Sequence, residues 1–247
     1  MAITKEQAAG RIMVALDYPN WAAAEKLLNA LEGIPCWMKV GMELIYAEGL
    51  SIIGDLRRRG YRVFVDLKLH DIPNTVRGGI ASLTRHGANM LNVHAAGGRR
   101  MLEAAREGLE QGLQGSGSSA ERPLLIAVTQ LTSTSRETMN GEIGIPGTVE
   151  DTVVRYARMA AESGLDGVVS SPLEVRIVKE ACGDGFITVT PGIRPAGSDI
   201  GDQSRIMTPG QAIAAGTDYM VIGRAITAAA DPRASMEAIL DELVAHA

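Results

Sequence analysis

The sequence predicts a (β/α)₈ barrel, in which eight parallel strands alternate with helices around a closed sheet. Eight short apolar runs recur along the chain, and segments with helical periodicity follow them. The chain has 247 residues, which is the usual size of one such barrel. Runs that are apolar at nearly every position are typical of parallel strands covered on both faces. A doubly wound open sheet has the same alternation, so periodicity leaves it open as the alternative.

The predicted elements follow one another without a visible domain boundary, so we expect a single domain over residues 1–247. The predicted strands are residues 12–16, 37–40, 62–67, 90–93, 124–128, 167–169, 186–189 and 219–222. Residues 20–31 and 101–112 are helix candidates, because their Ala and Leu residues recur at i, i+3 and i+4. Residues 114–121 form a Gly/Ser-rich segment that predicts a surface loop. Residues 194–209 predict a long polar loop, of a length typical of lids and binding loops.

The composition limits the class of protein. Hydrophobic residues make up 46% of the chain and aromatic residues only 4%, which favours an α/β protein over an aromatic-rich β-sandwich. The formal net charge is −5 and no basic tail is present, so nucleic acid is not an expected partner. Cys36 and Cys182 lie far apart and outside any CxxC pattern, and we interpret both as reduced and structural. Because no apolar run approaches the roughly 18 residues of a membrane span, we expect a soluble, cytoplasmic protein without membrane contact.

Polar residues gather where the predicted strands end. Catalytic groups of a barrel lie at the carboxyl ends of its strands and in the loops that follow. The polar residues at these positions are Asp17, Lys39, Asp66, Lys68, Asp71, His94, Thr129, Gln130, Thr132, Arg194, Gly223 and Arg224. Because all the carboxyl ends meet at one rim of a barrel, this pattern predicts a functional site there.

The stretch VDLKLHDIPNT, residues 65–75, carries the densest charge at a strand end. Side chains alternate along a strand, so Asp66 and Lys68 are expected on one face, with Leu67 on the other. Asp71 follows closely and could reach the same site or a neighbouring one. A lysine between carboxylates is expected to stay protonated, which favours Lys68 as a proton donor over a Schiff-base nucleophile. The alternative is a structural ion-pair network at the rim.

The end of the eighth predicted strand resembles a phosphate site. Gly223 and Arg224 open a helix there, and backbone N–H groups at a helix start beside an arginine bind phosphate. Arg194 and the polar loop at the seventh strand favour this reading, because barrel enzymes often hold phosphate with the loops after strands seven and eight. The alternative is an ordinary strand-to-helix turn with a solvated arginine. For His94, a structural rim position is the alternative to a catalytic one.

Metal and nucleotide-cofactor motifs are missing from the sequence. No cluster of His, Cys and Asp has metal-ligand spacing, so we predict no metal site. Neither G-x-G-x-x-G nor G-x-x-x-x-G-K-[ST] occurs, which argues against a dinucleotide cofactor or a P-loop.

Seven sequence blocks, in order, resemble the bacterial type of the orotidine 5′-monophosphate decarboxylase family. The blocks are VALDYPN (residues 14–20), MKVGMEL (38–44), VFVDLKLHDIPNT (63–75), NVHAAGG (92–98), VTQLTS (128–133), TPGIRP (190–195) and VIGRAIT (221–227). The resemblance covers essentially the whole chain. It implies a cofactor-free decarboxylation of orotidine 5′-phosphate to UMP, the last step of pyrimidine synthesis.

The resemblance also implies roles for individual residues. Lys68 would deliver a proton to C6 of the pyrimidine, within a charge array formed by Lys39, Asp66, Lys68 and Asp71. Asp71 would come from the second subunit of a homodimer with shared active sites. The other substrate contacts implied are Asp17, Lys39 and Thr75 at the ribose, Thr132 at the pyrimidine, and Arg194, Gln203, Gly223 and Arg224 at the phosphate, with Gln203 spanning phosphate and base.

Two rival functions stay open at this point. A phosphosugar enzyme such as a hexulose-phosphate synthase or a keto-gulonate-phosphate decarboxylase also carries D-x-K-x-x-D, but uses Mg²⁺ and an enediolate intermediate. Lys39, the D-I-P-N-T continuation and the Gln-bearing loop favour the orotidine reading. A non-catalytic nucleotide-binding barrel is the second rival.

Overall fold

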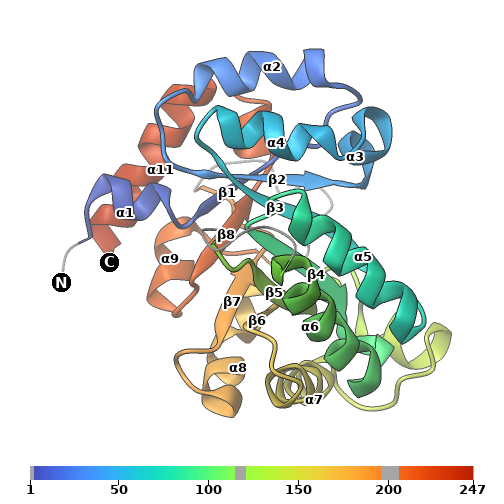
Figure 1. Cartoon of the computed structure of the whole chain (residues 1–247). Coiled ribbons are helices and arrows are strands. Elements are labelled where there is room, and N and C mark those ends of the chain that lie inside the picture. The colour runs from blue at the N-terminus through green and yellow to red at the C-terminus, as the bar shows by residue number, and fades with distance from the viewer. Residues whose placement is uncertain (1–2, 115–120, 196–205, 247) are drawn as a thin grey trace.

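Eight parallel strands close into a barrel with helices around it, in a computed structural model that describes residues 3–114, 121–195 and 206–246 (Figure 1). The strands are β1 (Ile12–Ala15), β2 (Trp37–Gly41), β3 (Arg62–Leu69), β4 (Met90–His94), β5 (Leu124–Val128), β6 (Gly167–Val169), β7 (Ile187–Thr190) and β8 (Tyr219–Ile222). Each strand pairs in parallel with the next, and β8 pairs with β1. The predicted (β/α)₈ barrel is therefore confirmed, and the open sheet is excluded.

Helices connect the strands on the outside of the barrel. They are α1 (Lys5–Ala9), α2 (Trp21–Ala30), α3 (Met42–Glu48), α4 (Ser51–Arg58), α5 (Pro73–Arg85), α6 (Arg99–Gln114), α7 (Val149–Glu162), α8 (Val175–Cys182), α9 (Pro209–Ala214), α10 (Arg224–Thr227) and α11 (Pro232–His246). Short turns of other helical types are η1 (Ala95–Gly97), η2 (Thr138–Glu142) and η3 (Pro172–Glu174). None of the helices in the described ranges is long and apolar enough to cross a membrane.

Both predicted helices are present, with small differences at their ends. Asn20 is the N-cap of α2 and its side chain accepts a hydrogen bond from the backbone N–H of Ala23. The second candidate lies within α6. The polar loop predicted to reach residue 209 ends earlier, because Thr208 caps α9 and Pro209 is the first residue of that helix. Residues 115–120 and 196–205 of the two predicted loops lie outside the described part of the chain.

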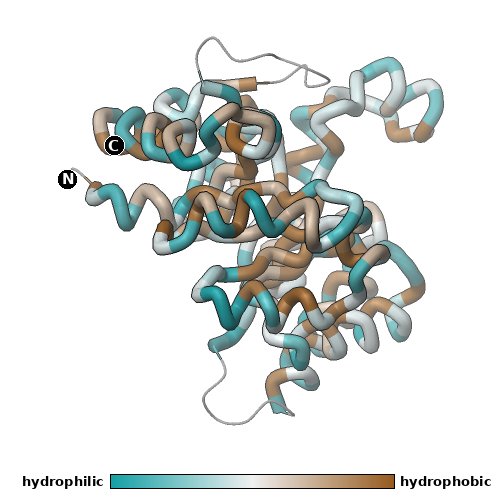
Figure 2. Tube along the Cα trace, turned by 90° about the horizontal axis from the view of Figure 1, so that it is seen from above, coloured by the Kyte–Doolittle hydropathy of each residue, from teal (hydrophilic) through white to brown (hydrophobic). Residues whose placement is uncertain are grey.

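Apolar side chains form two cores, one on each face of the sheet. The larger core lies between the strands and the helices and includes Leu28, Val40, Ile80 and Leu102. Figure 2 shows the helices alternating between hydrophilic and hydrophobic along their length, as expected for helices that pack one face on a sheet. The smaller core fills the barrel interior, where Met13, Trp37, Phe64, Met90, Ile126 and Val189 pack together.

The period of two along each strand turns this apolar interior into a polar rim. A residue two positions after an inward-facing one faces inward again, one layer closer to the carboxyl ends. Three neighbouring strands make this change from large apolar to polar: Trp37 to Lys39 on β2, Phe64 to Asp66 on β3, and Met90 to Asn92 on β4. The apolar layer therefore forms the floor on which the polar groups stand.

Gly167 allows the close approach of β6 to β7. A Cβ atom at this position would lie 2.2 Å from the carbonyl oxygen of Ile187 on the neighbouring strand. Because that neighbour is backbone, it cannot rotate away. Any other residue would push the two strands apart.

Candidate active site

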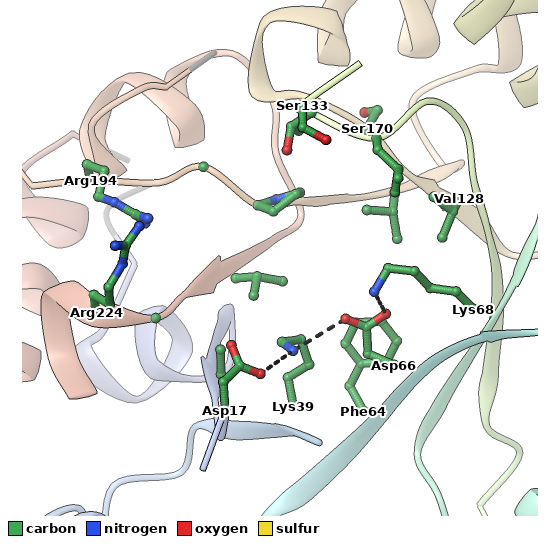
Figure 3. A pocket seen from close by; sticks show the side chains of 18 of the residues that line it. Asp17, Lys39, Phe64, Asp66, Lys68, Val128, Ser133, Ser170, Arg194 and Arg224 are labelled. Carbon is green, nitrogen blue, oxygen red and sulfur yellow. Dashed lines mark hydrogen bonds and ion pairs between the residues drawn. The ribbon is translucent and has the colours of Figure 1, made fainter. Parts of the chain in front are cut away.

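A cavity of about 530 Å³ opens at the carboxyl ends of the strands (Figure 3). Its lining includes nine of the residues that the sequence singled out: Asp17, Lys39, Asp66, Lys68, Gln130, Thr132, Arg194, Gly223 and Arg224. These residues come from segments spread over most of the chain. The barrel brings them together, as the strand-end pattern predicted.

Four charged side chains form a continuous chain on one side of the cavity. Lys39 Nζ lies 3.3 Å from Asp17 Oδ1 and 3.3 Å from Asp66 Oδ2. Lys68 Nζ lies 2.7 Å from the other oxygen, Asp66 Oδ1. Lys39 and Asp66 are 8% and 9% exposed, so their charges are screened little by solvent. These ion pairs connect Asp17, Lys39, Asp66 and Lys68 in that order, so negative and positive charges alternate along the row (Figure 3).

The Asp66 carboxylate is held in its charged form. Burial alone would raise the pKa of Asp66, but the ammonium groups of Lys39 and Lys68 lower it. Hydrogen bonds from Lys68 and Asn92 lower the pKa further, and the net value lies below the ordinary one. Asp66 is therefore ionised at neutral pH.

Lys68 reaches the cavity from an irregular part of β3. The strand extends two residues beyond its predicted end, and its register against β4 shifts between Val65 and Leu69. Within this shift Lys68 has φ 51°, in the left-handed region that is sparsely populated by non-glycine residues. Such a conformation costs on the order of 1–3 kcal/mol and persists only where neighbouring contacts impose it. Asp66 and Lys68 do share the cavity as predicted, but regular strand alternation is not the whole reason.

Two arginines occupy the opposite side of the cavity. Arg194 and Arg224 point toward one another there, away from the lysine and aspartate side chains (Figure 3). Gly192, with φ 80°, turns the chain after β7, and Arg194 N then donates to Met207 O at 3.0 Å. Gly223 is the N-cap residue of the four-residue helix α10, so the predicted helix start at Arg224 is confirmed. Two guanidinium groups beside each other form a site suited to a dianion such as phosphate.

Comparisons with known proteins show the family of this chain. A model of the "Orotidine 5'-phosphate decarboxylase / HUMPS family" matches residues 10–239. The chain belongs to this family. It is 53% identical over 221 residues to a protein of Bacillus cereus (strain Q1) named orotidine 5'-phosphate decarboxylase, covering 90% of this chain and 92% of the relative. A protein of the same name from Moorella thermoacetica is 51% identical over 236 residues, covering 96% and 93% of the two chains.

Solved structures give the same result. The chain superimposes with a TM-score of 0.83 on the crystal structure of orotidine 5'-phosphate decarboxylase from Lactobacillus acidophilus. The identity is 42%, and the match covers 94% of this chain and 98% of that one. An uncharacterized conserved protein from Geobacillus kaustophilus superimposes equally well, with a TM-score of 0.83 and 46% identity over 94% and 99% of the chains.

Two residues that the family resemblance implied, Asp71 and Thr75, do not line the cavity of this chain. Asp71 and Thr75 are exposed at the start of α5, and the Asp71 carboxylate accepts a hydrogen bond from Ile72 N at 2.6 Å. Gln203 lies outside the described residues. Nothing in the described part of the single chain therefore brings Asp71 and Thr75 to the charged groups.

The two histidines near Lys68 lie beside the cavity and do not line it. The His70 and His94 rings have centroids 5.6 Å apart. Burial lowers the pKa of His94, His70 and Lys68 lower it further, and Asp66 opposes them. His94 is therefore neutral at pH 7, which fits the alternative of a structural rim residue.

Some polar groups of the site were not predicted as functional. Asn92, on β4, donates to Asp66 Oδ1 at 2.6 Å. Ser133, Ser170 and Thr227 line the cavity. The Ser170 hydroxyl is buried and has no hydrogen-bond partner in the described structure. Ser170 directly follows β6, but Asn92 lies inside β4 and Thr227 is the last residue of α10, so no shared sequence signal separates these residues from their neighbours.

Within the described ranges, no three His, Cys, Asp or Glu side chains lie close enough together to hold a metal ion. A metal ion in the cavity would need the Asp66 carboxylate as a ligand, but both oxygens of this carboxylate already have partners. Asp66 Oδ1 accepts from Lys68 and Asn92, and Asp66 Oδ2 faces Lys39.

Proposed function

We propose that this protein decarboxylates orotidine 5′-phosphate to UMP and CO₂, the last step of pyrimidine synthesis. One observation carries the proposal: the Lys68 ammonium is held against buried Asp66 at the cavity, opposite the paired arginines. The names of the relatives that share about half of its residues support the same reaction. We also propose that the whole chain forms one domain and that the protein acts in the cytoplasm.

Lys68 is the proposed proton donor. When CO₂ leaves C6 of the pyrimidine, its bonding electron pair stays on carbon with little resonance stabilisation. A fixed ammonium beside C6 stabilises that developing charge and then transfers a proton to the carbon. The products are UMP, CO₂ and neutral Lys68, which regains a proton from water. No cofactor is required for this sequence of steps.

Asp66 and Lys39 have supporting roles in this scheme. The Asp66 carboxylate fixes the Lys68 ammonium in one place, and Lys39 balances the negative charge of Asp66 from the other side. Asp17 is the second carboxylate on Lys39. Both residues are proposed to contact the ribose. Repulsion between Asp66 and the departing carboxylate could contribute, but stabilisation by the fixed ammonium is the larger proposed effect.

The substrate phosphate is proposed to bind at Arg194, Gly223 and Arg224. This places the phosphate on the opposite side of the cavity from Lys68. Binding energy from this remote group is proposed to lower the barrier still further, by drawing the polar segment between Arg194 and Thr208 over the substrate. Gln203, in that segment, is proposed to span phosphate and base. Thr132, in the lining, is proposed to contact the pyrimidine.

The working unit is proposed to be a homodimer in which Asp71 and Thr75 complete the partner's site. Both residues are exposed and face no group of their own cavity. Large apolar side chains are exposed in the same part of the chain. Ile72, directly after Asp71, is 66% exposed. Met42 and Tyr46 lie one turn apart on α3, which follows the adjacent strand β2, and are 48% and 74% exposed. Exposed apolar groups around polar ones are typical of a surface that a second protein covers.

The dependence on divalent cations distinguishes this function from the phosphosugar chemistry of the same family. The protein is treated with EDTA, and the fall in absorbance on consumption of orotidine 5′-phosphate is followed. We expect full turnover in EDTA, because the ammonium groups provide the positive charge. Activity that requires added Mg²⁺, or no turnover of this substrate, would overturn the proposal.

A further inference from the structure

Asn92 contacts both catalytic residues of the neighbouring strand. It lies on β4, is 2% exposed and faces the barrel interior. Its Oδ1 accepts a hydrogen bond from the backbone N–H of Lys68 at 2.7 Å, and its Nδ2 donates to Asp66 Oδ1 at 2.6 Å. The orientation of the amide follows from its partners, because a backbone N–H only donates and a carboxylate only accepts.

The first of these bonds occurs where the regular ladder is interrupted. Val65 pairs with Leu91 and Leu69 pairs with Val93, so β3 has additional residues between the two pairs. Lys68 lies in this bulge with φ 51°. In this bulge the backbone N–H of Lys68 points to Asn92, and the side-chain oxygen of Asn92 accepts its hydrogen bond. A buried N–H without such an acceptor would be costly, so this bond helps to hold the left-handed conformation.

The second bond fixes the carboxylate on which Lys68 depends. Asp66 Oδ1 receives the Lys68 ammonium and the Asn92 amide together. The amide is neutral, so it orients the carboxylate without weakening its attraction for the two lysines. The charged or titratable groups around this carboxylate are Lys39, Lys68, His94 and, through Lys39, Asp17.

We propose that Asn92 is a positioning residue for the reaction, whose amide holds the Lys68 backbone in the left-handed bulge and orients Asp66, so that the ammonium points into the cavity. This inference rests on the proposed function. Asn92 does not line the cavity. It therefore acts through the two catalytic residues.

The chain offers a matched control in Asn89. This asparagine is also buried, comes just before β4 and also accepts a hydrogen bond from the β3 backbone, at 2.9 Å from Val63 N. It lies at the amino end of the two strands, away from the cavity. Asn92→Leu and Asn89→Leu therefore remove the same kind of bond between the same strands, and only Asn92→Leu removes it at the active site.

For Asn92→Leu we expect kcat to fall by about 10- to 100-fold, the loss typical of a hydrogen bond to a charged group. The affinity for UMP, measured by calorimetry, should change by less than about threefold, since phosphate and ribose contacts are untouched. Asn89→Leu should lower the unfolding temperature but keep kcat. In Asn92→Leu, the acid limb of the pH profile of kcat should shift to higher pH, because the pKa of Asp66 rises when the hydrogen bond from Asn92 is lost.

If Asn92→Leu fails to fold, Asn92→Asp tests the positioning role of Asn92 instead. A protonated Asp at this position has the donor and acceptor of the amide, whereas its ionised form repels Asp66. The ratio of its kcat to the wild-type value should therefore rise as the pH is lowered from about 8 to about 5. A purely structural role would leave this ratio flat.

The outcomes separate this inference from the proposed function. A wild-type protein that does not convert orotidine 5′-phosphate overturns both. If wild type is active, equal kcat values for Asn92→Leu and Asn89→Leu overturn only the role of Asn92. So does a ratio for Asn92→Asp that does not depend on pH.

Discussion

Lys68 turns its ammonium onto Asp66, two residues earlier in the same strand, at a distance of 2.7 Å. Lys68 is also the one non-glycine residue with positive φ in the described parts of the chain. Strain at this position coincides with the proposed proton donor. Residues held in sparsely populated conformations occur preferentially at active sites, where the surrounding structure imposes them.

Arg224→Ala tests the phosphate site. With orotidine 5′-phosphate we expect kcat/KM to fall by about 100-fold, because charge-assisted hydrogen bonds to the phosphate are lost. With orotidine, which has no phosphate, the slow reaction should change by less than about threefold. Comparing the two substrates in steady-state assays measures this. Equal losses on both substrates would show that Arg224 does not act through the phosphate.

Mixing two inactive variants tests the shared sites. Lys68→Ala and Asp71→Ala each damage every site of their own dimer, but a hybrid dimer contains one site with neither change. After subunit exchange at equal amounts, about one quarter of the sites should be intact, and activity should return to that level. Exchange is verified separately with tagged subunits. If exchange occurs and activity stays absent, Asp71 does not serve the partner's site.

His94 should make stability depend on pH in the weakly acidic range. Its pKa in the folded protein lies below the ordinary value of 6.5, chiefly because of burial. As the pH falls through about 6.5, the unfolded chain takes up a proton that the folded chain resists, so the free energy of unfolding decreases. His94→Gln should make this decrease smaller in urea titrations at several pH values. If the free energy of unfolding of His94→Gln depends on pH as it does in wild type, the lowered pKa of His94 is not the cause.

The close approach of β6 to β7 predicts different results for two glycines. Gly167→Ala puts a Cβ 2.2 Å from the Ile187 carbonyl oxygen and should lower the free energy of unfolding by about 1–3 kcal/mol or more. Gly185→Ala, in the turn before β7, meets no atom within 4 Å and should stay within about 0.5 kcal/mol of wild type. Urea unfolding at one fixed protein concentration measures both. Similar values for the two variants would contradict this packing.

The barrel could be predicted from the sequence because its signal is local. Each strand is a short apolar run, and each run ends in polar residues, so the positions of Lys39, Asp66 and Arg224 followed from strand geometry alone. The site predicted at the carboxyl ends exists as one cavity.

The details that depend on contacts between distant residues could not be predicted. Nothing near Lys68 in the sequence favours a left-handed lysine, and its conformation depends on Asn92, 24 residues away. Asn92 itself has the sequence context of any inward-facing strand residue. In the proposed homodimer, the places of Asp71 and Thr75 in a complete site depend on a second subunit, which a single chain does not contain.

Lys68 is the proposed donor of the proton that completes decarboxylation. The most direct measurement is the release of labelled CO₂ from carboxyl-labelled orotidine 5′-phosphate by wild type and by Lys68→Ala, with circular dichroism and UMP binding as checks of the fold. We expect the variant to fold and to bind UMP, but to release CO₂ at least about 10⁴-fold more slowly than wild type, because it lacks both the proton donor and the stabilising charge. Release by Lys68→Ala at a rate near the wild-type value would contradict the account.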